Sequence, residues 1–85
     1  MQRERIMIHS EEIRLDGLLK FAGATTTGGE AKLLIQAGRI LVNGVREVHR
    51  GRNLHAGDVI ELLDEEGELL NGWEIARRDE PGEAP

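Results

Sequence analysis

The stretch RILVNGVREV, residues 39–48, constrains the fold of this 85-residue chain more than any other segment. Ile40 and Val42 alternate with other residues ahead of Asn43-Gly44, a dipeptide that favours positive φ at both centres of a type I′ turn. Val45 and the residues after it are then expected to form the return strand. The sequence therefore predicts a β-hairpin at Asn43-Gly44, and with it an antiparallel sheet.

A first helix is expected ahead of this hairpin, in RLDGLLKFAG, residues 14–23. Apolar residues recur there at positions i, i+3, i+4 and i+7, which places one apolar stripe on a helix. The stripe consists of Leu15, Leu18, Leu19 and Ala22. Gly23 is expected to end this helix, because glycine adopts the left-handed conformation that a helix terminus favours.

A second helix is expected to begin at Thr27. Thr27 and Glu30 have the spacing of a capping box, in which the hydroxyl accepts from the Glu30 N–H and the carboxylate accepts from the Thr27 N–H. Gly28 lies in the first turn, where a poor helix former suggests that another molecule approaches the backbone closely. Gly38 is expected to end the helix.

The remaining segments are expected to be short strands. Residues 5–9 and 59–62 have apolar character typical of strands, and residues 69–76 suggest a final hairpin around Asn71-Gly72. The order of helices and strands predicts an α+β fold. We divide the chain into an N-terminal strand or extension (1–13), a central domain (14–63), a C-terminal extension (64–78) and a disordered acidic tail (79–85).

Composition limits the class of protein. Hydrophobic residues make up 39 % of the chain, enough for one core, and Phe21 and Trp73 are the only aromatic residues. We expect an aliphatic core with Trp73 as an anchor of the C-terminal strand. The absence of cysteine excludes disulfides and cysteine-based zinc sites. Neither a membrane-spanning run nor a secretory signal is evident, so a cytoplasmic protein is expected.

The charge of the chain is segregated. The formal net charge is −5, yet residues 14–60 hold seven basic and four acidic residues, a net charge of +3. Residues 61–85 hold nine acidic and two basic residues, a net charge of −7. Such asymmetry indicates contact with nucleic acid. The acidic C-terminal segment is expected to serve solubility, with competition for the basic surface as the alternative.

Three segments in order, RLDGLLKFAG, TTGGEAKLLIQAGRILVNG and RGRNLHAGDVIEL, resemble the S4 RNA-binding domain. More narrowly, they resemble its stand-alone bacterial group of small YbcJ/YaaA-like proteins. The resemblance covers residues 14–62 and implies an αL-type motif, in which two short helices pack on a small, mainly antiparallel sheet. It also implies a non-catalytic protein that binds structured RNA, ribosomal or transfer RNA, with roles in translation or at the ribosome.

Candidate RNA-binding residues follow from the resemblance and from the chemistry of phosphate, which arginine can bind with two parallel hydrogen bonds. They are Arg14, Thr27, Gly28, Lys32, Arg39, Asn43, Arg46, His49, Arg50 and Arg52. In the αL arrangement the cations among them should converge on one face. Asn43 is expected to aim the flanking arginines, and the N–H groups at Gly28 could hold a phosphate. His49 is expected to be a partly exposed strand residue near cations.

Two departures from the family pattern weaken the expected affinity. Most S4 domains carry an arginine where this chain has Gly28, although glycine there is usual in the stand-alone group. The stand-alone group also tends to have cations where this chain has His49 and Asn53. With so few aromatic residues, stacking on bases is not expected to supply most of the affinity.

Alternatives remain open. The arginines could form an ordinary solvated surface, and the domain could be a protein-interaction module or an accessory subunit that delivers RNA to a modifying enzyme. The spacing of His9, His49 and His55 matches no familiar metal site, and Glu65, Glu66 and Glu68 are expected to be a solvated loop. We expect no catalytic residue, no cofactor and no metal, and the sequence does not indicate an oligomeric state.

Overall fold

The computed structural model describes residues 3–77 and contains two helices and seven strands in this range. The helices are α1 (Leu15–Phe21) and α2 (Gly28–Gln36). The strands are β1 (Arg3–Ile8), β2 (Ile13–Arg14), β3 (Ile40–Val42), β4 (Val45–Arg46), β5 (Asn53–Leu54), β6 (Val59–Leu63) and β7 (Leu69–Arg77). The expected acidic tail, residues 79–85, lies outside the described residues.

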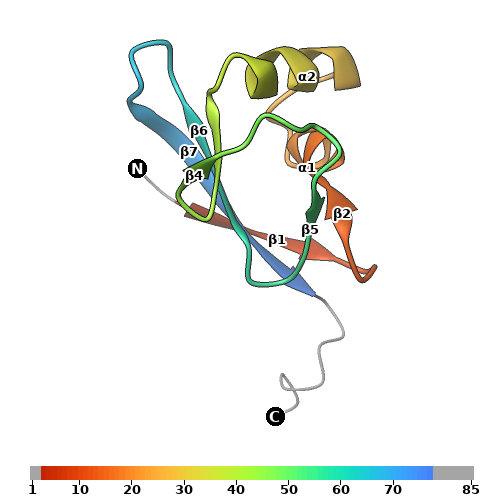
Figure 1. The fold of residues 1–85 in the computed structure, drawn as a ribbon. Helices are drawn as coiled ribbons and strands as arrows, with labels where there is room; N and C mark the ends of the chain where they lie inside the picture. The colour runs from red at the N-terminus through yellow and green to blue at the C-terminus, as the bar shows by residue number, and fades with distance from the viewer. Residues whose placement is uncertain (1–2, 78–85) are drawn as a thin grey trace.

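Five strands form one sheet in the order β1-β7-β6-β3-β4, and β2 pairs with β5 as a separate two-stranded sheet. All pairs are antiparallel except β1 with β7, which run parallel. Both helices lie on one side of the five-stranded sheet (Figure 1). The predicted α+β fold, with two short helices on a mainly antiparallel sheet, is confirmed.

Helix α1 forms where the apolar stripe predicts it. Leu15, Leu18 and Leu19 are completely buried, and Gly23 follows the helix with a φ of +81°. The first two N–H groups of the helix donate to the segment that follows β4: Leu15 N–H to the Arg52 carbonyl at 2.9 Å and Asp16 N–H to the Arg50 carbonyl at 3.0 Å. These bonds satisfy donors that a helix start leaves unpaired, and they fix residues 50–52 against α1.

Helix α2 begins with the predicted cap, with one difference. The Thr27 hydroxyl accepts from the Glu30 N–H at 3.1 Å. The Glu30 carboxylate, however, binds Thr26 rather than Thr27 at close range: it accepts from the Thr26 N–H at 2.7 Å and from the Thr26 hydroxyl at 2.9 Å. The hydrogen bond from the Thr26 backbone N–H contributes most to lowering the pKa of Glu30.

The hairpin at Asn43-Gly44 is confirmed, with φ angles of 52° and 83° at the two residues. The Asn43 side chain then links the turn to the start of β6. Its amide donates to Asp58 at 3.0 Å, and its carbonyl oxygen accepts from the Val59 N–H at 2.9 Å. The contacts of this side chain therefore serve the fold.

The expected hairpin around Asn71-Gly72 is wrong, because both residues lie inside the continuous strand β7. Gly72 pairs with Arg3 of β1 on one side and with Glu61 of β6 on the other. Burial of Trp73 and Ile75 on the core face outweighs the local turn preference. The turn between β6 and β7 is made by residues 64–68 instead.

One hydrophobic core joins the helices to the five-stranded sheet. Trp73 is 1 % exposed, which confirms its predicted role as a core anchor, and the other large buried side chains are aliphatic. β1 comes from the predicted N-terminal segment (1–13), and β7 comes from the predicted C-terminal extension (64–78). Both strands belong to the same sheet and core as the central domain. Among the described residues, no helix is long and apolar enough to cross a membrane.

Candidate nucleic-acid interface

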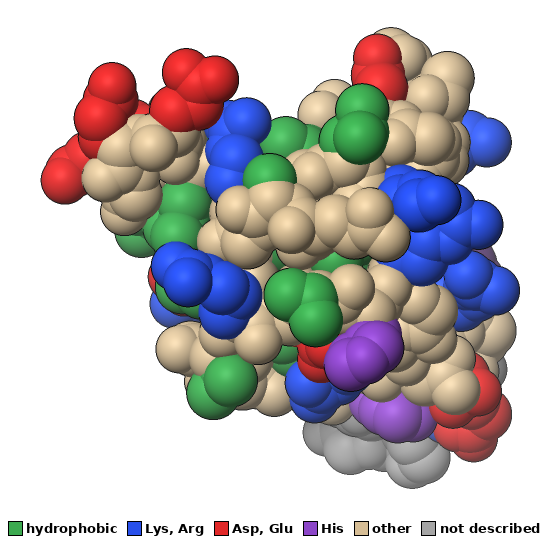
Figure 2. Space-filling model, turned by 45° about the horizontal axis from the view of Figure 1, so that its top comes forward, with side chains coloured by type: hydrophobic (Ala, Val, Ile, Leu, Met, Phe, Trp, Pro, Cys, Tyr) green, Lys and Arg blue, Asp and Glu red, His purple; other side chains and the backbone are tan. Residues whose placement is uncertain are grey.

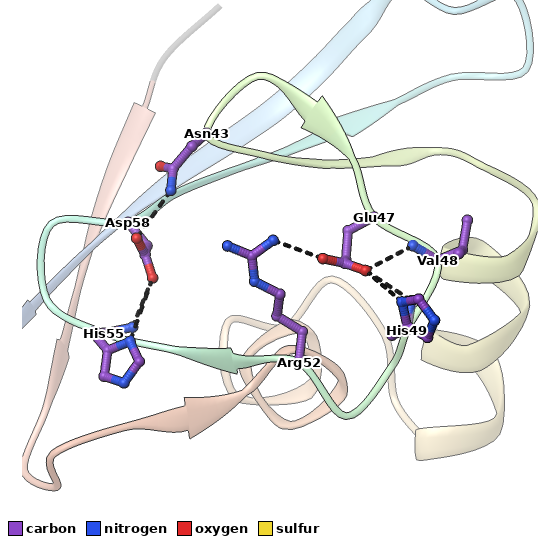
Figure 3. Close-up of polar contacts among 7 residues, drawn as sticks. All are labelled: Asn43, Glu47, Val48, His49, Arg52, His55 and Asp58. Atoms are coloured by element: carbon purple, nitrogen blue, oxygen red, sulfur yellow. Dashed lines mark hydrogen bonds and ion pairs between the residues drawn. The ribbon is translucent and has the colours of Figure 1, made fainter.

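The segment 47–52, which we call the arginine loop, is organised around the carboxylate of Glu47 (Figure 3). Oε2 of Glu47 accepts from the N–H groups of Val48 and His49, both at 3.1 Å, and contacts His49 Nδ1 at 3.0 Å. Oε1 accepts from Arg52 Nη1 at 2.7 Å. The Glu47 side chain is only 12 % exposed. The hydrogen bond from Arg52 is the main cause that lowers the pKa of Glu47 to about 2, so Glu47 is ionised at neutral pH.

A second carboxylate, that of Asp16 on α1, holds two more arginines. Arg14 donates to it at 3.2 and 3.1 Å, and Arg50 Nε lies 3.7 Å from Asp16 Oδ2. The Asp16 side chain also accepts from the Gly17 N–H at 2.8 Å, as expected of an acidic residue at a helix start. The arginine loop and the start of α1 thus share one surface.

Close packing supports this surface. A Cβ atom on Gly51 would lie 3.5 Å from Arg14 Nη2, so the guanidinium of Arg14 rests against the backbone of the arginine loop. Side-chain exposures of Arg14, Arg50 and Arg52 are 56, 47 and 40 %. A guanidinium has five N–H donors, and the carboxylates use only some of them. Exposed donors remain on all three arginines.

The other predicted cations are more scattered. Arg46 packs on the end of α2, where a Cβ on Gly38 would lie 3.1 Å from Arg46 Cδ. Lys32 is exposed on α2, and within residues 3–77 neither side chain has an acidic partner. Arg39 donates from Nε to the Leu63 carbonyl at 2.9 Å, at the start of the acidic β6–β7 loop. Figure 2 shows the basic side chains in separate groups over this face.

Two of the predicted site residues make contacts within the fold. Thr27 caps α2, and Asn43 links the hairpin turn to the start of β6. At Gly28 an added Cβ would meet nothing within 4 Å, so the backbone there is open to another molecule. His49 lies in a loop with its side chain 83 % exposed, and the expectation of a strand position is wrong because the strand ends at Arg46.

Sequence reasoning missed the two organising carboxylates. Neither Asp16 nor Glu47 was among the predicted site residues, yet each binds arginine side chains. The position of Glu47, inside a run of cations, was the available signal. Within residues 3–77 no group of three or more His, Cys, Asp or Glu residues could hold a metal ion.

Comparison with known proteins gives a consistent result. The model of the S4 domain family matches residues 6–70. A protein named probable ribosome maturation protein RlbA, from Bacillus subtilis, is 40 % identical over 57 residues, which cover 67 % of this chain and 80 % of that protein. The small ribosomal subunit protein uS4 of Dictyoglomus thermophilum is 40 % identical over 55 residues, and that of Dictyoglomus turgidum is 38 % identical. This chain spans 27 % of the length of both uS4 proteins and aligns over 65 % of its own.

Proposed function

Because this chain belongs to the S4 domain family, we propose that it is a non-catalytic protein that binds structured RNA, with ribosomal RNA favoured over transfer RNA. Support for a ribosomal setting comes from the names of its relatives, which are a probable ribosome maturation protein and two ribosomal subunit proteins. The proposed contact surface consists of the arginine loop and the start of α1.

The observation that carries the proposal is the pair of partly buried carboxylates that bind three exposed arginines. Asp16 and Glu47, with side chains 15 and 12 % exposed, hold Arg14, Arg50 and Arg52 in fixed positions. Fixing a long side chain before binding reduces the entropy that binding must remove. Fixed cations suit the regular phosphate spacing of a folded RNA better than a flexible single strand.

The aromatic residues support the same conclusion. Trp73 is 1 % exposed and so cannot stack on a base, which leaves Phe21, 62 % exposed, as the one Phe, Tyr or Trp ring at the surface. Binding of single strands commonly depends on several stacking platforms. Recognition through shape and phosphates is therefore favoured.

The test is fluorescence anisotropy with an RNA stem-loop, a single-stranded RNA and a duplex DNA, measured over a series of salt concentrations. A site with about four or five phosphate contacts should give a slope of roughly −3 to −4 for log affinity against log salt. The double variant Arg50→Glu/Arg52→Glu should lose binding to the stem-loop. The matched control is Arg3→Glu/Arg5→Glu, which makes the same charge change on the exposed edge strand β1.

Equal loss in both double variants would mean that net charge, and not the arginine loop, determines the affinity. If the wild type fails to bind the stem-loop even at low salt, the arginines are a solvated surface, and a protein-interaction module or an accessory subunit of an RNA-modifying enzyme becomes the better explanation.

A further inference from the structure

His49 differs from the other exposed side chains of the arginine loop, because it places an imidazole ring among guanidinium groups. Its side chain is 83 % exposed, and its Nδ1 atom lies 3.0 Å from Oε2 of Glu47. Its backbone N–H donates to the same oxygen at 3.1 Å, so backbone and ring are anchored at one point. The other oxygen of this carboxylate binds Arg52 (Figure 3). The ring is therefore held on its Nδ1 side and open to solvent elsewhere.

The partner of Nδ1 determines which ring nitrogen of His49 carries a hydrogen. Glu47 is ionised, and an ionised carboxylate can only accept a hydrogen bond. Nδ1 must therefore be the donor in this contact. In a neutral imidazole one nitrogen donates and the other accepts, so Nε2 is left as an acceptor. Within residues 3–77, Nε2 of His49 has no hydrogen-bond partner.

The ring of His55 is arranged differently. Its Nε2 atom lies 3.1 Å from Oε2 of Glu12, and its Nδ1 atom lies 4.0 Å from Oδ2 of Asp58. Both ring nitrogens thus face carboxylates of the protein itself. His55 also lies outside the arginine loop, which makes it a matched control for His49.

An acceptor nitrogen among cations selects a particular chemical group. It cannot bind an ionised phosphate oxygen, because that oxygen is also an acceptor, but it can bind a hydroxyl. Every ribose of RNA carries a 2′-hydroxyl, which can donate and which lies between consecutive phosphates of the strand. Glu47 holds the guanidinium of Arg52 and the ring of His49 on its two oxygens, so a phosphate donor and a hydroxyl acceptor lie next to each other.

We propose that Nε2 of neutral His49 accepts a hydrogen bond from a ribose 2′-hydroxyl and so makes the arginine loop selective for RNA over DNA. This inference rests on the proposed function and adds to it the group that distinguishes the two nucleic acids. The arginines bind phosphates, which RNA and DNA share, whereas His49 binds a hydroxyl that DNA lacks.

The experiment compares an RNA stem-loop with a version in which fluorine replaces every 2′-hydroxyl. Fluorine removes the donor and keeps the phosphates and the A-form shape, so the contacts of the hydroxyl groups are tested alone. The ring ¹⁵N signals of His49 in the free protein at pH 8 should show a hydrogen on Nδ1 and none on Nε2. Anisotropy at the same pH should show that the wild type prefers the hydroxyl form.

Three variants separate the hydroxyl contact from other contributions. His49→Phe keeps a ring without an acceptor and should reduce the preference about threefold to tenfold, the effect of one hydrogen bond. Glu47 retains its bonds from Arg52 and from two backbone N–H groups in this variant, so the loop should be kept. His49→Gln should retain part of the preference, because its amide oxygen can accept near the position of Nε2. The control His55→Phe should leave the preference unchanged.

A hydrogen on Nε2 of His49 at pH 8 would overturn the proposal. An unchanged preference in His49→Phe would also overturn it, because the ring would then contribute through charge or packing alone. If Arg50→Glu/Arg52→Glu abolishes binding while His49→Phe keeps the preference, the proposed function stands and only this inference fails. If the wild type binds neither stem-loop, the proposed function itself fails, and the selectivity fails with it.

Discussion

Replacing Glu47 with glutamine should destabilise the protein, because this carboxylate organises the whole arginine loop. It accepts one hydrogen bond from Arg52 at 2.7 Å and one each from the N–H groups of Val48 and His49 at 3.1 Å, and it contacts His49 Nδ1 at 3.0 Å. A hydrogen bond to a charged group contributes roughly 1.5–3 kcal/mol, and exposure of Arg52 to solvent reduces this value. Glutamine keeps one acceptor oxygen for the backbone donors. We expect a loss of about 1–2 kcal/mol in the free energy of unfolding at neutral pH.

The loss should depend on pH in a defined direction. Folding lowers the pKa of Glu47 from 4.5 to about 2, so the folded protein favours the ionised form. The stabilisation is complete above pH 4.5, and it disappears as the pH falls through about 2. Glutamine does not titrate, so the difference between wild type and Glu47→Gln should be largest at pH 7 and small near pH 2.

Urea unfolding, followed by the fluorescence of the buried Trp73, measures the free energy of unfolding at pH 7 and near pH 2. The control is Glu65→Gln, which changes an exposed carboxylate that makes no hydrogen bond within residues 3–77. It should leave the free energy of unfolding unchanged at either pH. If Glu47→Gln lowers the free energy of unfolding equally at pH 7 and near pH 2, the charge of this carboxylate does not stabilise the arginine loop. The same conclusion follows if the substitution has no effect at pH 7.

Three further changes test local features. Thr27→Ala removes the cap of α2 and should lower the free energy of unfolding by about 1 kcal/mol in urea titrations. Gly38→Ala should lower the free energy of unfolding by at least about 1 kcal/mol in the same assay, because its φ is +77° and the new Cβ would lie 3.1 Å from Arg46 Cδ; a neutral result would contradict both the backbone strain and the tight contact. Gly28→Asp should weaken binding of the stem-loop RNA severalfold if the backbone N–H groups there hold a phosphate. An unchanged affinity would reject that role.

Features fixed by neighbouring residues could be predicted from the sequence. The turn at Asn43-Gly44, the Thr27 cap and the stripe of α1 each depend on residues within about one helical turn or one hairpin. Features that depend on distant partners could not. Asn71-Gly72 has the same local turn preference as Asn43-Gly44, but its neighbours on β1 and β6 hold it in an extended strand.

The same distinction applies to the candidate site. The arginines were predictable because their charge is visible in the sequence and their positions match a family pattern. The pairing of Arg50 with Asp16 could not be predicted, because it depends on backbone hydrogen bonds that join the arginine loop to α1 across the fold.

The parallel pairing of β1 with β7 has a consequence for the order of events during synthesis. β1 leaves the ribosome before the other described elements, whereas its partner, residues 69–77, is made last among them. The nascent chain can therefore form its helices and the Asn43-Gly44 hairpin while β1 still lacks a neighbour. Closing so long a loop is slow, and the charged residues Arg3, Glu4 and Arg5 discourage the waiting strand from pairing with another chain. Completion of the sheet must therefore wait until β7, the last of the described elements, has emerged from the ribosome.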